Sequence, residues 1–132
     1  MALHAAVAVG TIIVRSKPFR EFVAYEVRVL TCKKVREKHP DKIPVIVERD
    51  ESSKNIPEID KTKFICNGDT SVRVFVAELR GMLKLDSKTA LFVFVGDNVV
   101  AATHRMMGEV YEKHKDTDGF LYMKYSGENT FG

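Results

Sequence analysis

The side chains that could carry out chemistry are scattered along the chain and form no recognised catalytic or metal-binding pattern. The residue types that bind transition metals are four histidines and two cysteines, namely His4, His39, His104, His114, Cys32 and Cys66. The histidines lack metal-ligand spacing, and the cysteines lie far apart without a C-x-x-C arrangement. The pattern therefore indicates neither a zinc site nor a disulfide framework. Two thiols in a chain of 132 residues favour a reducing compartment.

Two further candidate motifs, a calcium-binding loop and a nucleophile triad, lack residues that such sites require. The run Asp116-Thr117-Asp118-Gly119 is similar to the start of a calcium loop, but its glycine is misplaced and no glutamate follows at the twelfth position. A turn is the better interpretation. Ser126 and Cys66 have no neighbouring base that would suggest a nucleophile triad, and no glycine-rich phosphate loop is present. An enzyme has little support, and a small hydrolase stays only as a third alternative.

The hydrophobic pattern places these residues on alternating helices and strands. Within residues 19–38, apolar residues recur at three- and four-residue steps, namely Phe22, Tyr25, Val29 and Cys32. With a basic remainder, this pattern predicts an amphipathic helix that stops before His39-Pro40. A second helix is capped by Thr70 or Ser71. Its apolar face comprises Val72, Phe75, Val76, Leu79 and Leu83. Residues 104–115 show a weaker helical pattern.

Four apolar runs predict strands. They are Ile43–Glu48, Lys63–Cys66, Ala90–Val95 and Phe120–Tyr125. The run Ala90–Val95 is apolar throughout, as a strand covered on both faces would be. Two paired strands followed by a long helix over one face of the sheet predict an α+β fold. The order is that of a ubiquitin-like β-grasp with an additional N-terminal helix and an N-terminal extension.

Length and composition predict one domain with two appendages. Hydrophobic residues make up 45% and charged residues 30%, and two full domains would each be too small to bury an adequate core. We expect an N-terminal extension over residues 1–18, a ubiquitin-like domain with its helical subdomain over 19–125, and a flexible conjugation tail over 126–132. The net charge of +3 is too small to indicate nucleic acid.

The N-terminal extension lacks the features of a targeting segment. Residues 1–14 have no basic n-region and are shorter than the ~20 apolar residues of a membrane span. Residues 7–14 are β-prone and nearly uncharged, which would favour association if they were exposed. We therefore expect them to pack on the domain or to pair with a sheet edge.

Several runs together resemble the ubiquitin-like autophagy modifiers, the family of light chain 3 and the GABA-A-receptor-associated protein. The runs are HPDKIPVIVER (39–49), IDKTKFIC (59–66), ALFVFV (90–95) and DGFLYMKYSGENTFG (118–132). The resemblance covers roughly residues 34–132 with compatible spacing. Many colinear segments are more specific than one short motif.

The resemblance implies that Gly132 is the chemically active residue. In this family the terminal glycine is passed through activating and conjugating enzymes to the amino headgroup of phosphatidylethanolamine, and a cysteine protease removes residues beyond it and later releases the lipid. A glycine leaves the backbone free and has no side chain to obstruct a narrow channel. The sequence either corresponds to the processed form or ends in an encoded glycine. The implied location is the cytoplasm and, after lipidation, the autophagosomal membrane. A non-conjugated adaptor that binds peptides or cytoskeletal filaments is the main alternative.

The resemblance also implies a site for receptors that carry an aromatic-x-x-aliphatic segment, added as a strand beside residues 63–66. The aromatic pocket would use Val35, Pro44, Lys63, Ile65 and Phe120. The aliphatic pocket would use Phe64, Cys66, Phe75 and Leu79. Arg36, Lys61, Lys63 and Arg80 would attract acidic residues of the ligand. For Phe75 and Leu79 an ordinary core position is an equal alternative, and the lysines could form a solvated face.

Four residues depart from the family pattern around these pockets. They are Thr31 at the aromatic pocket, Thr70 and Glu78 where apolar residues usually line the aliphatic pocket, and Met82 where a basic residue is usual. A carboxylate at Glu78 would oppose burial of an aliphatic side chain unless it reaches water or a cation. We therefore expect altered selectivity at the second pocket.

Overall fold

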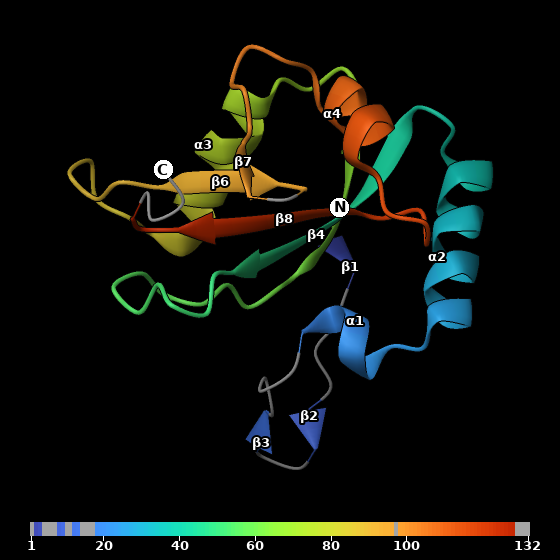
Figure 1. Ribbon diagram of the computed structural model, residues 1–132, viewed down its shortest axis with the longest axis horizontal. Helices are drawn as coiled ribbons and strands as arrows, with labels where there is room; N and C mark the ends of the chain where they lie inside the picture. Colours follow the sequence, from blue (N-terminus) through green and yellow to red (C-terminus); the bar gives the residue numbers. More distant parts are fainter. Residues whose placement is uncertain (1, 4–7, 10–11, 14–17, 97, 129–132) are drawn as a thin grey trace.

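The four apolar runs and two short strands form a six-stranded sheet in the computed structural model, which describes residues 2–3, 8–9, 12–13, 18–96 and 98–128 (Figure 1). The helices are α1 (Phe19–Phe22), α2 (Tyr25–Lys38), α3 (Val72–Leu83) and α4 (Met107–His114). The strands are β1 (Ala2–Leu3), β2 (Ala8–Val9), β3 (Ile12–Ile13), β4 (Lys42–Arg49), β5 (Lys63–Asn67), β6 (Phe92–Val95), β7 (Val99–Val100) and β8 (Leu121–Ser126).

The sheet has the strand order β1-β5-β4-β8-β6-β7. Strands β4 and β8 run parallel at its centre, whereas the other neighbouring pairs are antiparallel. With α3 following the β4–β5 pair, this is the predicted α+β, ubiquitin-like arrangement. Strand β6 is buried as predicted, although it lies between β8 and β7 rather than at the centre of the sheet.

The alternation of side chains along the strands creates two cores, one on each face of the sheet. Along β4, Val45 and Val47 belong to the larger core, which α3 and α4 complete. Ile46 points to the other face, where it packs with Phe19 and Phe120. Helix α3 begins as predicted, because the Ser71 side chain caps it.

The structure divides the single helix predicted over residues 19–38 into two. Val23 and Ala24 are extended and separate α1 from α2. The break is held by one contact that is distant in sequence and by one local contact. Phe19 donates its backbone N–H to a Glu48 carboxylate oxygen at 2.8 Å, and the Arg28 Nε donates to the Val23 carbonyl at 3.0 Å.

The buried face of α2 also differs from the predicted one. Arg28, Cys32 and Val35 are its buried residues, at steps of four and three. Phe22 and Tyr25, which the periodicity placed on the inner face, are 48% and 45% exposed. Of the predicted apolar face only Cys32 is among these buried residues, and the polar Arg28 is buried outside that face.

The N-terminal extension pairs with the domain through residues that precede the predicted run. Ala2 and Leu3 lie antiparallel to Phe64 and Lys63 at the edge of the main sheet. Within the run 7–14, Ala8 and Val9 pair with residues 12–13 in a separate two-stranded sheet. Figure 1 shows this hairpin apart from the main sheet. In the part of the chain that the structure describes, no helix is long and apolar enough to cross a membrane.

The C-terminal strand is shifted by one residue, from the predicted Phe120–Tyr125 to Leu121–Ser126. Ser126 belongs to β8, lies opposite Phe92 and is buried, so its inclusion in a flexible tail over residues 126–132 is wrong. Its hydroxyl donates to the Glu128 carbonyl, and Gly127 donates its N–H to the Ser53 hydroxyl at 2.8 Å. These bonds tie the residues after β8 to the loop that follows β4.

Candidate peptide-binding edge and groove

The backbone groups at the outer edge of β5 follow from the β4–β5 register. Pro44 lies opposite Ile65 and has no N–H to donate, so this is a pair without mutual hydrogen bonds. Val47 donates its N–H to the Thr62 carbonyl at 2.8 Å. Because hydrogen-bonded and non-hydrogen-bonded pairs alternate in an antiparallel ladder, the N–H and C=O of Lys63 and Ile65 point away from β4.

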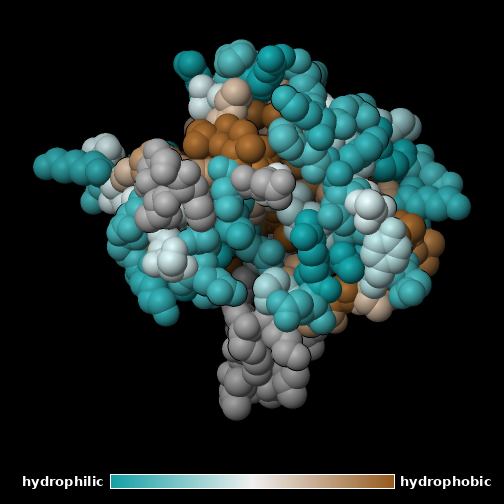
Figure 2. Space-filling model, in the orientation of Figure 1, coloured by the Kyte–Doolittle hydropathy of each residue, from teal (hydrophilic) through white to brown (hydrophobic). Residues whose placement is uncertain are grey.

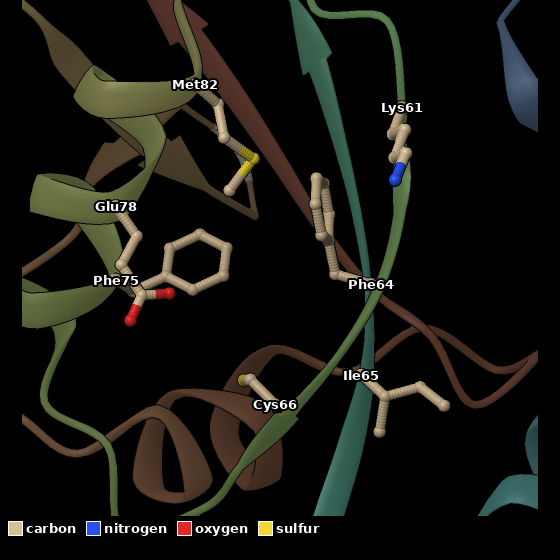
Figure 3. Close-up of a pocket in the computed structure, with 7 residues that line it drawn as sticks. All are labelled: Lys61, Phe64, Ile65, Cys66, Phe75, Glu78 and Met82. Atoms are coloured by element: carbon tan, nitrogen blue, oxygen red, sulfur yellow. The ribbon is translucent and has the colours of Figure 1, made fainter. Parts of the chain in front are cut away.

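The side chains of β5 alternate between the two cores. Phe64 faces α3, where its ring meets Phe75 edge-on with centroids 6.5 Å apart. Lys63 and Ile65 face the α1–α2 side, and the Lys63 ammonium lies 5.6 Å from the centre of the Phe19 ring. Figure 3 shows Ile65 pointing away from Phe64 and Phe75. The same strand can therefore present a different surface to a ligand on each of its faces.

The structure brings together the residues expected to line the aromatic pocket, on the α2 side of the sheet. Pro44 and Ile65 are partners across β4 and β5, and Phe120 leads into β8, which runs beside β4. Val35 comes from α2, and Lys63 is half-buried at the edge. The sequence analysis missed Phe19, whose ring packs edge-on against Phe120 at 5.3 Å.

A groove of about 200 Å³ lies on the opposite side of β5, between this strand and α3 (Figure 3). Its lining residues are Lys61, Phe64, Ile65, Cys66, Phe75, Glu78 and Met82. Phe64, Cys66 and Phe75 were predicted to line the aliphatic pocket. Leu79, the fourth predicted member, is 1% exposed and belongs to the core beneath.

Comparisons with known proteins agree over most of the chain. Residues 27–132 match the family described as "Autophagy protein Atg8 ubiquitin like". Autophagy-related protein 8d of Arabidopsis thaliana is 50% identical over 107 residues, which cover 81% of this chain and 88% of that protein. Autophagy-related protein 8 of Mycosarcoma maydis is 46% identical over 114 residues, which cover 86% and 95%. The chain belongs to the Atg8 family of ubiquitin-like autophagy proteins.

A solved structure supports the same assignment at the level of the fold. The crystal structure of Trypanosoma brucei ATG8 matches with a TM-score of 0.79 and 42% identity, covering 89% of this chain and 100% of that one. The family match begins at Val27, earlier than the resemblance noted from residue 34. Residues 27–33, which form half of α2, therefore belong to the Atg8 family match although the resemblance in the sequence begins only at residue 34.

Glu78 contributes a carboxylate to the lining of the groove in this Atg8 protein. It is exposed on α3, and Figure 3 shows its carboxylate beside the Phe75 ring. Burial, together with the nearby Glu78 carboxylate, raises the pKa of the Cys66 thiol to about 11. Burial also lowers the pKa of Lys63 on the other face of β5. A ligand entering the groove thus meets a neutral thiol, with the Glu78 carboxylate and the Lys61 ammonium both in the lining.

We expect Cys66 to react slowly with iodoacetamide at pH 8, because the thiolate is the reactive form. Its pKa of about 11 makes the expected rate about a hundredfold lower than that of an ordinary exposed thiol. The rate should increase with pH up to about 11. Mass spectrometry of native and urea-unfolded protein at equal pH measures the difference, and equal rates in the two states would contradict the prediction.

The basic residues expected to attract acidic ligand residues divide into two groups. Arg36 donates to the Lys42 carbonyl at 2.6 Å, and Arg80 donates to the carbonyls of Asp86 and Thr89. These two guanidinium groups are held by backbone within the domain. Lys61 lines the groove and is exposed, so it is the cation best placed beside the ligand edge.

A buried ionic cluster fixes α2 and the entry to β8, and the sequence analysis did not anticipate it. The Arg28 guanidinium donates to the Asp118 carboxylate at 2.7 Å, and the Asp118 side chain is fully buried. Tyr122 donates its hydroxyl to the same carboxylate oxygen, while the other oxygen accepts the Phe120 N–H at 2.8 Å. Asp118 thereby positions Phe120 in the expected aromatic pocket.

Gly132, the predicted conjugation residue, lies outside the described residues. Among the described residues, no group of three or more histidines, cysteines and carboxylates is arranged to hold a metal ion.

Proposed function

We propose that this Atg8-family chain is conjugated through Gly132 to phosphatidylethanolamine and recruits receptors with aromatic-x-x-aliphatic segments during autophagosome formation. Its family supports the first part, because Atg8 proteins are ubiquitin-like modifiers rather than enzymes. The sequence SGENTFG supplies a glycine in register with the family's terminal residue. Lipid transfer in a reconstituted conjugation system is the direct test.

The chemistry of the conjugation belongs to the partner proteins. An activating enzyme would adenylate the Gly132 carboxylate with ATP, and thioesters would carry the acyl group to the lipid amine, where an amide forms. A cysteine protease would expose the glycine and later hydrolyse the amide. The protein would be cytoplasmic before lipidation and bound to the autophagosomal membrane afterwards.

The arrangement around β5 carries the proposal of peptide binding. The outward backbone groups of Lys63 and Ile65 are the ones that a strand added at this edge would use. The ligand's aromatic side chain would then lie on the α2 side, beside the half-buried Lys63, and its aliphatic side chain would enter the groove between Phe64 and Phe75. The exposed Lys61 would favour acidic residues in the ligand.

Replacing Glu78 with valine is expected to strengthen binding of an aromatic-x-x-Leu peptide. The carboxylate at the groove loses hydration when an aliphatic side chain covers it, whereas valine adds apolar surface. We expect a gain of about 1 kcal/mol, or roughly fivefold in Kd. Isothermal titration of wild type and Glu78→Val with one peptide measures it.

The matched control is Glu112→Val. Glu112 is an exposed helical carboxylate on α4 and does not line the groove, yet its loss changes the net charge equally. Its peptide affinity should stay at the wild-type value. Equal affinities for wild type and Glu78→Val would show that the carboxylate does not set the selectivity of this groove.

A further inference from the structure

The outer edge of β5 already has a neighbour in this protein. Strand β1 runs antiparallel to β5, with Ala2 opposite Phe64 and Leu3 opposite Lys63, and it is the terminal strand of the main sheet (Figure 1). Residues far apart in the sequence thus meet at the edge that the proposed function assigns to a ligand.

The register indicates which backbone groups β1 uses. The N–H and C=O of Lys63 point away from β4, as derived above from Pro44 and Val47. Leu3 lies opposite Lys63, so this is the pair in which both residues exchange N–H···O bonds. A peptide added as a strand would need the same two groups of Lys63. Occupation by β1 and occupation by a receptor peptide therefore exclude each other.

Phe19, the first residue of α1, lies close to the same edge, with its ring centre 5.6 Å from the Lys63 ammonium. Downstream of the β2–β3 hairpin, Phe19 is fixed by its N–H bond to Glu48 and by its ring contact with Phe120. Because this anchor lies on the same domain, β1 meets the edge as an intramolecular partner, with an effective concentration on the order of millimolar. Pairing through two residues is weak enough for a tighter ligand to displace it.

We propose that the first residues of the chain are an internal occupant of the β5 edge, which a receptor peptide must displace before it binds. The inference rests on the proposed peptide-binding function. It makes the N-terminal segment an autoinhibitory strand that lowers apparent affinity without altering either pocket. Receptors that bind weakly would be excluded, and receptors with more contacts would be admitted.

The test compares Leu3→Pro with wild type in the full chain. Proline removes the N–H that pairs with Lys63 and disfavours the ladder. Val9→Pro is the matched control, because it alters the β2–β3 hairpin and leaves the β1–β5 pairing in place. The Kd for a labelled aromatic-x-x-Leu peptide is measured by fluorescence anisotropy, and the exchange of the Lys63 amide hydrogen is measured by NMR without peptide.

We expect Leu3→Pro to bind the peptide about threefold to tenfold more tightly than wild type, the range that the net value of one hydrogen bond gives. Val9→Pro should match wild type, and the Lys63 amide should exchange faster only in Leu3→Pro. Equal affinities and equal exchange in wild type and Leu3→Pro would overturn the inference and leave peptide binding intact. Absence of binding in all variants would overturn the peptide-binding function itself, and the inference with it.

Discussion

Deletion of Gly132 should abolish transfer of the protein to phosphatidylethanolamine and leave its stability unchanged. The Gly132 carboxylate would be the acyl group of the amide, so a chain that ends at Phe131 presents a bulky side chain at the reacting position. The buried residues that the structure describes end at Ser126, six positions earlier. The assay contains ATP, activating and conjugating enzymes and phosphatidylethanolamine vesicles, and reads the product by gel mobility and mass.

Gly132→Ala separates the need for a carboxylate from the need for glycine. Alanine keeps the carboxylate, but its methyl group restricts the backbone and occupies the channel through which the tail must pass. We expect transfer to fall by roughly tenfold to a hundredfold, the size of effect that a displacement of about 1 Å has on a reaction.

The matched control for both variants is Glu128→Ala, which changes an exposed side chain of the same segment and keeps Gly132. It should be lipidated at the wild-type rate. If the deletion variant were lipidated as well as wild type, conjugation through Gly132 would be excluded. A non-conjugated adaptor of the same fold would then be the better description of the protein.

Much of the fold could be predicted because its elements have strong local patterns. The β-branched run around Val45 predicts β4, and the face that includes Val72, Phe75 and Leu79 predicts α3 with its Ser71 cap. Their buried side chains recur at periods of two and of three to four residues, which a short window of sequence reveals.

The remaining elements depend on contacts between distant residues. The helix α1 is fixed by the bond from the Phe19 N–H to Glu48, 29 residues away, and β1 pairs with Lys63, which lies far along the chain. Two-residue strands such as β7 bury little and have no periodicity of their own. A short stretch of sequence does not show which distant residues will come into contact, so these elements could not be predicted from it.

In the candidate site, too, some residues could be predicted from the sequence and others could not. The resemblance to the family implied a pocket that contains Phe64, Cys66 and Phe75, and these residues line the groove, whereas the residue pattern alone could not distinguish them from core. Leu79 shares the inner face of α3 with Phe75, yet it lies under the groove because the helix turns it toward the sheet. Glu78 and Met82, noted only as departures, are both lining residues.

Asp118→Ala is expected to have the largest effect on stability of any single substitution considered. The change leaves the Arg28 guanidinium buried without its partner and removes the acceptor of the Phe120 N–H. Breaking one side of a buried ion pair typically costs about 3–5 kcal/mol. We expect a loss of this size in the free energy of unfolding, measured by urea denaturation. Peptide affinity should fall as well, since Asp118 positions Phe120.

A double-mutant cycle distinguishes the ion pair from general damage to the fold. Arg28→Met removes the buried cation, so combining it with Asp118→Ala should be less destabilising than the sum of the two single changes. Glu112→Ala is the surface control, because its pair with Lys115 is exposed, and it should cost less than about 0.5 kcal/mol. Strict additivity of Arg28→Met and Asp118→Ala would mean that the two side chains stabilise the protein independently. The contact between α2 and the turn before β8 would then not be what holds the helix in place.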